Sequence, residues 1–311
     1  MLQAKVTRLQ VEQQTFTPEL IDFYLQEYDA KPETVRSYSK GLKHFSEYLQ
    51  VNGISTPDRT DLIRYKTFIS ETLKAGTVNY YINTIKALFT WTAWKGYYPN
   101  IGFKVKGVKN NTRTHKKDCL SSNEASLLLN SIDTGTVQGK RDKAIIRLMV
   151  TTGLRVTSIM QANIEDLRTV SDSSVLFYKG KGREDKDRYV KITEPVRQLL
   201  KDYLLTREQK APGEPLFVGT SNNGFGQRMT TRAISMLVKN RLKDAGYDNE
   251  RITAHSLRHT AATLNLLSGG TLEETQQLLD HSSINTTMIY LHHVTRIKNN
   301  SEQRIDGLIG D

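Results

Sequence analysis

The chain has 311 residues, 37% of them hydrophobic, and a mean hydropathy of −0.51, so it is long enough for two globular domains and lacks the composition of a membrane-spanning protein. Its 44 Lys and Arg residues exceed its 33 Asp and Glu residues and give a formal net charge of +11, which favours a polyanionic partner. A single cysteine, Cys119, excludes a disulfide framework and a cysteine-based metal site. Residues 1–14 lack the apolar core of a signal peptide, and no run is long enough to cross a bilayer, so we expect a cytoplasmic protein with no membrane partner.

The positive charge is concentrated in the first third of the chain. Residues 1–117 hold 18 basic and 10 acidic side chains, whereas residues 118–311 hold 26 and 23. A basic part attached to a nearly balanced part suggests a binding domain that serves a chemical domain. We therefore expect an N-terminal extension over 1–16, a helical binding domain over 17–102, a basic linker over 103–117, and a second domain over 118–311 that ends in a tail over 291–311.

The first domain is expected to be helical because its apolar residues recur every three or four positions. Residues 34–50 carry one such stripe and residues 79–95 carry another. The opposite faces are polar and basic, and they suit a nucleic-acid backbone as well as they suit plain solvent exposure. The candidate phosphate-contacting residues on these faces and in the linker are Arg36, Lys40, Lys43, Lys86, Lys106 and Lys109.

The second domain is expected to be mainly α with a small β-sheet, an α+β fold. Ser121 or Ser122 caps a helix with Glu124 in its first turn, and Gly153 stops an apolar helix over 142–152. Two β-rich runs, 175–178 and 188–192, flank a turn rich in glycine and charge, which predicts a hairpin. Further helices are expected over 194–207, 230–245, 256–267, 271–279 and 284–292.

Two patterns suit phosphate chemistry. Arg155 directly follows the Gly153 helix stop and begins the next helix, where free backbone N–H groups and the helix dipole attract anions. His255 and Arg258 lie at i and i+3 and therefore share one helix face. Arg258 can grip a phosphate bidentately while His255 reaches a neighbouring oxygen or the proton of a nucleophile. We interpret His259 as a structural histidine bonded to the backbone.

A further histidine and a tyrosine complete the set. His281 ends a helix opened by Thr271 and Glu274, and Tyr290 follows nine residues later. A tyrosine oxygen is a plausible phosphoryl nucleophile, because an aryl phosphodiester keeps its bond energy for the reverse reaction. His292 and His293 are adjacent, so they point apart on a helix, and no carboxylate lies at ligand spacing. We therefore expect no metal site.

These motifs, taken in order, resemble the signature of the tyrosine recombinase or phage-integrase family, and its Xer-like branch is the most similar. The resemblance covers about residues 120–292 and rests on G-L-R at 153–155, G-K-G at 180–182, H-S-L-R-H at 255–259 and L-L-D-H followed by Tyr290. The helical basic first part is similar to the core-binding domain of that family. The resemblance implies a site-specific DNA recombinase that is associated with the nucleoid.

The resemblance also implies a role for each residue. Tyr290 would attack the scissile phosphate and become joined to the 3′ phosphate, while Arg155 and Arg258 hold the non-bridging oxygens. Lys181 would protonate the departing 5′ oxygen, His255 would accept the tyrosine proton, and His281 would hydrogen-bond the phosphate. The reaction needs no cofactor. The partners would be double-stranded DNA, three further copies of the chain in a tetramer on two sites, and accessory DNA-bending or directionality proteins.

Three departures from the family pattern bear on these roles. Asp280 stands where the family usually has glycine, and Ser158 stands at a commonly acidic position, so its supporting contact must differ. The hairpin turn is about two residues longer than usual, which makes Lys179 and Lys186 rivals of Lys181 as the proton donor.

Two other functions remain open from the sequence. A type IB topoisomerase shares the cleavage chemistry without the strand exchange, and a DNA-binding regulator would keep the fold without catalysis. Retention of all six residues argues against the regulator. The tail carries apolar residues that would dock on a neighbouring protomer or pack on their own domain: Val294, Ile297, Ile305, Leu308 and Ile309.

Overall fold

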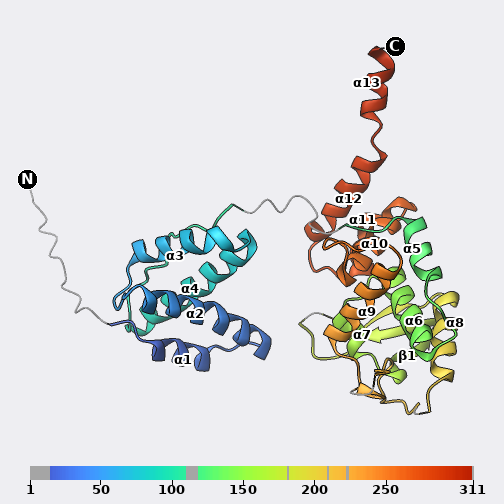
Figure 1. Cartoon of the computed structure of the whole chain (residues 1–311), viewed down its shortest axis with the longest axis horizontal. Coiled ribbons are helices and arrows are strands. Elements are labelled where there is room, and N and C mark those ends of the chain that lie inside the picture. The colour runs from blue at the N-terminus through green and yellow to red at the C-terminus, as the bar shows by residue number, and fades with distance from the viewer. Residues whose placement is uncertain (1–14, 110–117, 181, 209, 222–223, 310–311) are drawn as a thin grey trace, which may run out of the picture. The chain divides into compact units, whose positions relative to one another are not determined.

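The computed structural model describes residues 15–109, 118–180, 182–208, 210–221 and 224–309 (Figure 1). The chain divides into two compact units, with the division between Thr112 and Arg113. Residues 1–14 of the extension expected over 1–16, most of the expected linker and Lys181 lie outside the described residues. No helix in the described ranges is both long and apolar enough to span a membrane.

The described part of the first unit is helical, as predicted. Its elements are α1 (Pro18–Glu27), α2 (Pro32–Val51), α3 (Arg59–Thr72) and α4 (Ala75–Lys95). The core lies between α2, α3 and α4, and Leu42, Phe45 and Ile85 are fully buried there. The two predicted apolar stripes therefore face the core, which confirms the helical periodicity of 34–50 and 79–95.

The segment after α4 packs back on the first unit, although we expected a linker from residue 103. Val105 is 2% exposed and belongs to the core of this unit. The Asn79 side chain receives the Val108 N–H at 2.7 Å and donates to the Val108 carbonyl at 3.0 Å. Lys86 Nζ donates to the Val105 carbonyl at 3.0 Å. Asn79 and Lys86 on the polar face of α4 therefore hold the following segment through residue 108.

The described second unit combines helices with one antiparallel sheet. The helices are α5 (Ser122–Asn130), α6 (Val137–Thr152), α7 (Val156–Gln161), η1 (Ile164–Asp166), α8 (Glu194–Leu205), α9 (Thr231–Asp244), α10 (Ala254–Leu267), α11 (Leu272–Leu279), α12 (Ile284–Lys298) and α13 (Ser301–Ile309). The strands β1 (Leu167–Val170), β2 (Ser173–Tyr178) and β3 (Arg188–Lys191) lie in that order. The β2–β3 hairpin was predicted, whereas β1 was not.

Local capping signals fix several helix ends in the second unit. Ser121 and Glu124 bond each other's backbone N–H groups, as do Thr271 and Glu274. Gly153 ends α6 at φ +63°, in the left-handed region that favours glycine. Helix α10 then packs against α6, α9, α11 and α12. These contacts bring the helix that carries the H-S-L-R-H motif into the centre of the unit.

The C-terminal tail forms two helical segments rather than the shorter helix expected over 284–292. Val294 on α12 is buried on its own unit, whereas Ile297 is half exposed. No residue of α13 is buried, and Ile305, Leu308 and Ile309 are all exposed. Apolar packing therefore holds α12 on this unit but does not hold α13.

Candidate active site

The second unit contains a polar cavity of about 790 Å³ at the meeting point of α10, α11 and α12. Five of the six residues singled out from the sequence line it: Arg155, His255, Arg258, His281 and Tyr290. Lys181, the sixth, lies outside the described residues. These five side chains supply two guanidinium groups, two imidazoles and a phenol from segments that span 136 residues of sequence, from position 155 to 290. Two further arginines, Arg183 and Arg188 of the hairpin region, also line the cavity.

Arg155 occupies the N-cap position of α7, two residues after the glycine that ends α6. The turn at Gly153 packs closely against α11, because a Cβ on Gly153 would lie 2.7 Å from Leu279 Cδ2. The side chain of Arg155 is partly exposed and lines the cavity. A guanidinium in this position can bind an anion together with the positive end of the helix dipole.

Arg258 is the most buried cation of the site, with 4% exposure. Its Nη1 donates to the Gly153 carbonyl at 2.6 Å, and its Nη2 donates to the Leu279 carbonyl. Burial, with the nearby charge of Arg155, lowers the pKa of Arg258 to about 10. The guanidinium is therefore still charged at neutral pH and is held between the ends of two helices.

His281 lies in the turn between α11 and α12. Asp280 before it takes a left-handed conformation at φ +49°, which lets the backbone turn and points the imidazole at the cavity. The Nδ1 atom of His281 lies 3.0 Å from the hydroxyl of the buried Thr287. Burial, followed by the charges of Arg258 and Arg155, lowers the pKa of His281 to about 4. The imidazole is therefore neutral at physiological pH.

Tyr290 is 3% exposed and packs in an apolar cluster with Ala262, Leu266, Leu279 and Val294. The ring stacks nearly parallel to the His281 ring, with the centroids 6.4 Å apart. Burial raises the pKa of Tyr290 to about 12, although the charges of Arg258 and Arg155 act in the opposite direction. The phenol is therefore protonated at neutral pH, and it must lose that proton in order to act as a nucleophile.

His259 contacts the hydroxyl of Tyr290, a contact that its expected structural role did not include. Its Nδ1 atom lies 2.7 Å from the Tyr290 hydroxyl, and the side chain is buried with 9% exposure. His259 also lines the cavity, so it belongs to the site. The sequence held one signal for this placement: His259 follows His255 by four residues and therefore lies on the same face of α10.

His255 lies further out than His259. It is exposed, and its ring meets the His259 ring edge-on, with the centroids 4.6 Å apart. Its position on the cavity wall is compatible with contact to an oxygen of a bound phosphate.

The two rival lysines of the hairpin both pair with carboxylates. Lys186 Nζ bonds Asp166, which is almost fully buried, and Lys179 Nζ lies 3.2 Å from the exposed Glu184. A pair with a buried carboxylate is costly to break, whereas an exposed pair is worth little. The amine of Lys186 is therefore held by Asp166 and is a poor candidate for the proton donor, whereas the exposed pair holds the amine of Lys179 only weakly.

The two other departures in the sequence both contact the hairpin. Ser158 is buried, and its hydroxyl lies 3.5 Å from the Lys179 carbonyl at the end of β2. Asp280 lines the cavity and lies 3.7 Å from Arg188 Nε at the start of β3. The altered supporting contact of Ser158 therefore goes to the backbone of the hairpin.

The candidate phosphate-contacting residues divide into two groups. Arg36, Lys40 and Lys43 are exposed on α2, and Lys106 and Lys109 are exposed after α4. Lys86 differs, because its amine is bonded to the Val105 carbonyl and serves the packing of that segment. We therefore withdraw Lys86 as a candidate contact to DNA.

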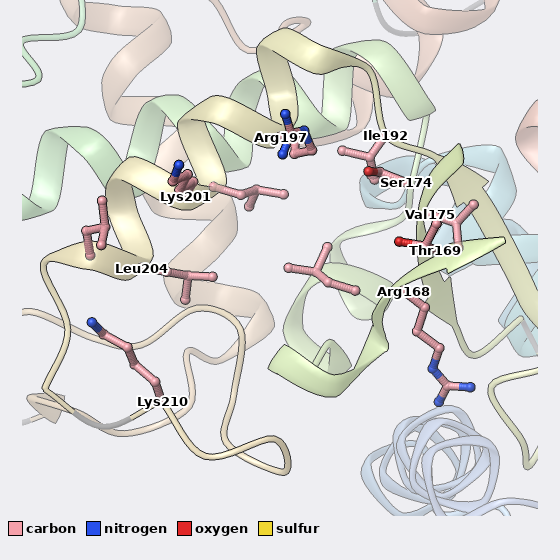
Figure 2. Close-up of a pocket in the computed structure, with 12 residues that line it drawn as sticks. Arg168, Thr169, Ser174, Val175, Ile192, Arg197, Lys201, Leu204 and Lys210 are labelled. Carbon is pink, nitrogen blue, oxygen red and sulfur yellow. The ribbon is translucent and has the colours of Figure 1, made fainter. Parts of the chain in front are cut away.

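A second hollow of about 450 Å³ lies between β1, β2 and α8 (Figure 2). Apolar side chains such as Val175, Ile192 and Leu204 line it, and Arg197 and Lys201 are among the basic ones. It contains none of the histidines or tyrosines of the first cavity. The described residues hold no group of three or more His, Cys, Asp or Glu side chains placed to bind a metal ion.

Family models match both units. Residues 118–296 match the phage integrase family, and residues 19–96 match the N-terminal SAM-like domain of phage integrases. The chain is 32% identical over 282 residues to the tyrosine recombinase XerC of Thermodesulfovibrio yellowstonii, covering 86% of this chain and 88% of that protein. It is 29% identical over 293 residues to the tyrosine recombinase XerD of Listeria monocytogenes, covering 90% of this chain and 94% of that protein.

Solved structures share the fold. The XerH site-specific recombinase in a post-cleavage complex with palindromic difH substrate aligns with a TM-score of 0.73 at 22% identity, over 91% of this chain and 83% of that one. A lambda integrase dimer bound to a COC′ core site aligns with a TM-score of 0.68 at 15% identity, over 89% of this chain and 95% of that one.

Proposed function

The chain belongs to the phage integrase family of tyrosine recombinases, and we propose that Tyr290 is the nucleophile with which this site-specific recombinase cleaves and rejoins DNA. One observation carries the proposal: the hydroxyl-bearing Tyr290 lines the same cavity as Arg155 and Arg258. Phosphoryl transfer depends mainly on positioning and on charge stabilisation, and this cavity offers a nucleophile beside two cations.

In the proposed cleavage step, Tyr290 Oη forms a bond to the scissile phosphorus while the bond from phosphorus to the 5′ oxygen breaks. Arg155 and Arg258 hold the non-bridging oxygens as their charge grows. With the Thr287 hydroxyl donating to Nδ1 of His281, the Nε2–H of this neutral imidazole is left to donate to the phosphate. The proton of Tyr290 passes to an imidazole of α10, either His255 on the outer wall, as the family resemblance implies, or its neighbour His259.

The departing 5′ oxygen needs a proton, and we assign its donation to Lys181 on the β2–β3 hairpin. The 3′-phosphotyrosyl bond preserves the energy of the phosphodiester, so a 5′ hydroxyl of a partner strand can reverse the reaction without a nucleotide or other cofactor. Integration, excision and dimer resolution all follow from this exchange.

We assign DNA binding to both units. Arg36, Lys40 and Lys43 on α2, with Lys106 and Lys109 after α4, supply exposed positive charge for the phosphate backbone. Each such contact releases condensed counterions, so affinity should fall steeply as salt rises. The XerH and lambda integrase neighbours were solved bound to DNA, which supports this assignment.

Strand exchange between two duplexes requires four cleavages, so we propose a tetramer on two sites, guided by accessory DNA-bending or directionality proteins in the nucleoid. Helix α13 offers surface for contact between protomers, because it exposes Ile305, Leu308 and Ile309. A chain truncated after Asn299 should still cleave a single site and should fail to assemble paired sites in a gel-shift experiment. Full assembly by the truncated chain would remove α13 from the interface.

The test of the proposed nucleophile uses nicked duplexes taken from the sequence that flanks the gene. The wild-type chain should form a protein–DNA adduct that survives denaturation, and Tyr290→Phe should bind the same duplex without forming it. An adduct with Tyr290→Phe would overturn the assignment. A wild-type chain that relaxes supercoils without recombining paired sites would point to topoisomerase activity.

A further inference from the structure

The contact between His259 and Tyr290 bears on which imidazole accepts the proton. Its Nδ1 atom lies 2.7 Å from Tyr290 Oη, and both side chains are at least nine-tenths buried. A hydrogen bond of this length between two buried groups fixes the phenol oxygen relative to the imidazole. The Tyr290 hydroxyl is the atom that would attack the phosphate, so His259 touches a reacting atom.

We propose that His259, rather than His255, accepts the proton of Tyr290 during DNA cleavage. This inference rests on the proposed function, because it presumes that Tyr290 is the nucleophile. As the Tyr290 Oη–phosphorus bond forms, the proton on that oxygen moves to His259 Nδ1. The bond from phosphorus to the 5′ oxygen breaks, and that oxygen takes a proton from the hairpin lysine. Rejoining returns both protons.

Burial raises the pKa of Tyr290 and opposes loss of its proton, whereas the two arginines of the cavity favour the transfer. Arg258 and Arg155 act on Tyr290 from α10 and from the start of α7, and their positive charge stabilises the phenolate that forms. The His281 ring stacks on Tyr290 from the turn after α11, and Cys119 acts on it from the segment before α5. His255 meets His259 edge-on at the exposed side of α10. The His259 imidazole thus has a ring nitrogen within hydrogen-bonding distance of the phenol oxygen.

The spacing of Arg258 and His259 lets helix α10 bind the phosphate and accept the proton of Tyr290 at the same time. His255, Arg258 and His259 lie at i, i+3 and i+4 on α10, so one helix face presents all three. Arg258 is directed to carbonyls at the ends of α6 and α11, whereas His259 is directed to α12. A single helix therefore positions the phosphate-binding cation and the proton acceptor relative to each other.

The test measures single-turnover adduct formation on the nicked duplex between pH 5 and 10, a range of about five units around the ordinary histidine pKa. His259→Asn places an amide near the Nδ1 position, so it can still hydrogen-bond Tyr290 but cannot accept a proton. We expect its cleavage rate to fall about 100-fold, the lower end of the range for general-base catalysis, with DNA affinity unchanged. Its rate should keep rising with pH where the wild-type rate levels off.

Chemical rescue separates proton acceptance from a purely structural role. A 3,5-difluorotyrosine at position 290 has a more acidic phenol and needs a proton acceptor less. In the His259→Asn chain it should restore the rate about tenfold or more, whereas in His255→Asn it should restore the rate by less than about threefold. His259→Gln serves as a second variant should His259→Asn unfold below the assay temperature.

The outcomes distinguish this inference from the proposed function. Cleavage by both His259 variants at close to the wild-type rate, with the wild-type pH profile, would overturn the role of His259 and leave Tyr290 as the nucleophile. Rescue in His255→Asn but not in His259→Asn would assign proton acceptance to His255. Adduct formation by Tyr290→Phe would overturn the proposed function itself.

Discussion

Asp142 on α6 bridges two arginines in the interior of the second unit, and removing it should destabilise that unit strongly. Its Oδ1 accepts from Arg141 Nε and Nη2 at 3.0 and 2.7 Å, and its Oδ2 accepts from Arg241 Nε and Nη2 at 2.9 and 2.8 Å. The side chains of Asp142 and Arg141 are 1% and 5% exposed, and that of Arg241 is 25% exposed. The carboxylate therefore ties α6 to α9 in a nearly dry setting.

Asp142→Ala removes the carboxylate partner of the buried Arg141 and of the partly buried Arg241. Breaking a buried pair from one side costs about 3–5 kcal/mol, because the remaining charge stays desolvated. In a unit of this size each kcal/mol lowers Tm by about 2–4 °C, so the expected fall is roughly 6–20 °C. Asp142→Asn keeps one acceptor oxygen and should lose less. Urea unfolding measures the loss of free energy of unfolding for each variant, and calorimetry measures the fall in Tm.

The matched control is Glu194→Gln, which breaks the exposed pair between Glu194 and Arg197 on α8. It should leave Tm unchanged within error, because exposed pairs contribute little. A loss below about 1 kcal/mol for Asp142→Ala would refute the reasoning, since it would mean that water or other groups solvate the two guanidinium groups as well as the carboxylate does.

Three further predictions concern pH, DNA affinity and backbone geometry. The pKa of His281 is lowered from 6.5 to about 4, so the unfolded chain binds the proton more readily than the folded chain does. The free energy of unfolding should therefore fall as the pH drops from about 6.5 to about 4. In urea titrations this fall should be shallower for His281→Asn, and equal slopes of stability against pH for the variant and the wild type would contradict the shift. Lys43→Ala should reduce the salt slope of DNA binding by about 1, whereas Lys86→Ala should leave it unchanged because its amine serves Val105; equal effects in binding isotherms would overturn this division. Gly153→Ala should cost at least about 1 kcal/mol of stability, since it strains a left-handed residue and crowds Leu279; a thermal melt like that of the wild type would show that the turn can relax.

Much of the second unit follows from local signals in the sequence. Ser121 with Glu124 and Thr271 with Glu274 each fix a helix start within four residues, and Gly153 fixes a helix end by its own conformation. The motif residues come together because α10, α11 and α12 pack around the apolar side of Tyr290. Such elements could be predicted because their determinants lie close together in the chain.

The features that were missed depend on contacts between distant segments. The bond from His259 to Tyr290 joins residues 31 positions apart on two helices, and the bond from Lys86 to Val105 joins a helix to a segment 19 positions later. Strand β1 carries little apolar pattern, because its two central residues are exposed. No residue of helix α13 is buried, so its sequence has no apolar face that packs on its own unit and would have predicted the helix.

The anchoring of Arg258 has a consequence for the reversibility of strand exchange. Its hydrogen bonds go to the carbonyls of Gly153 and Leu279, at the negative ends of the α6 and α11 dipoles, and these carry no full charge. Arg258 therefore breaks no ion pair with a described residue when a phosphate arrives or departs, because the carboxylate that lines the cavity, Asp280, pairs with Arg188 instead. The electrostatic reorganisation around Arg258 on entering and on leaving the proposed covalent state is then small in both directions, which suits a recombinase whose substrates and products are the same kind of bond.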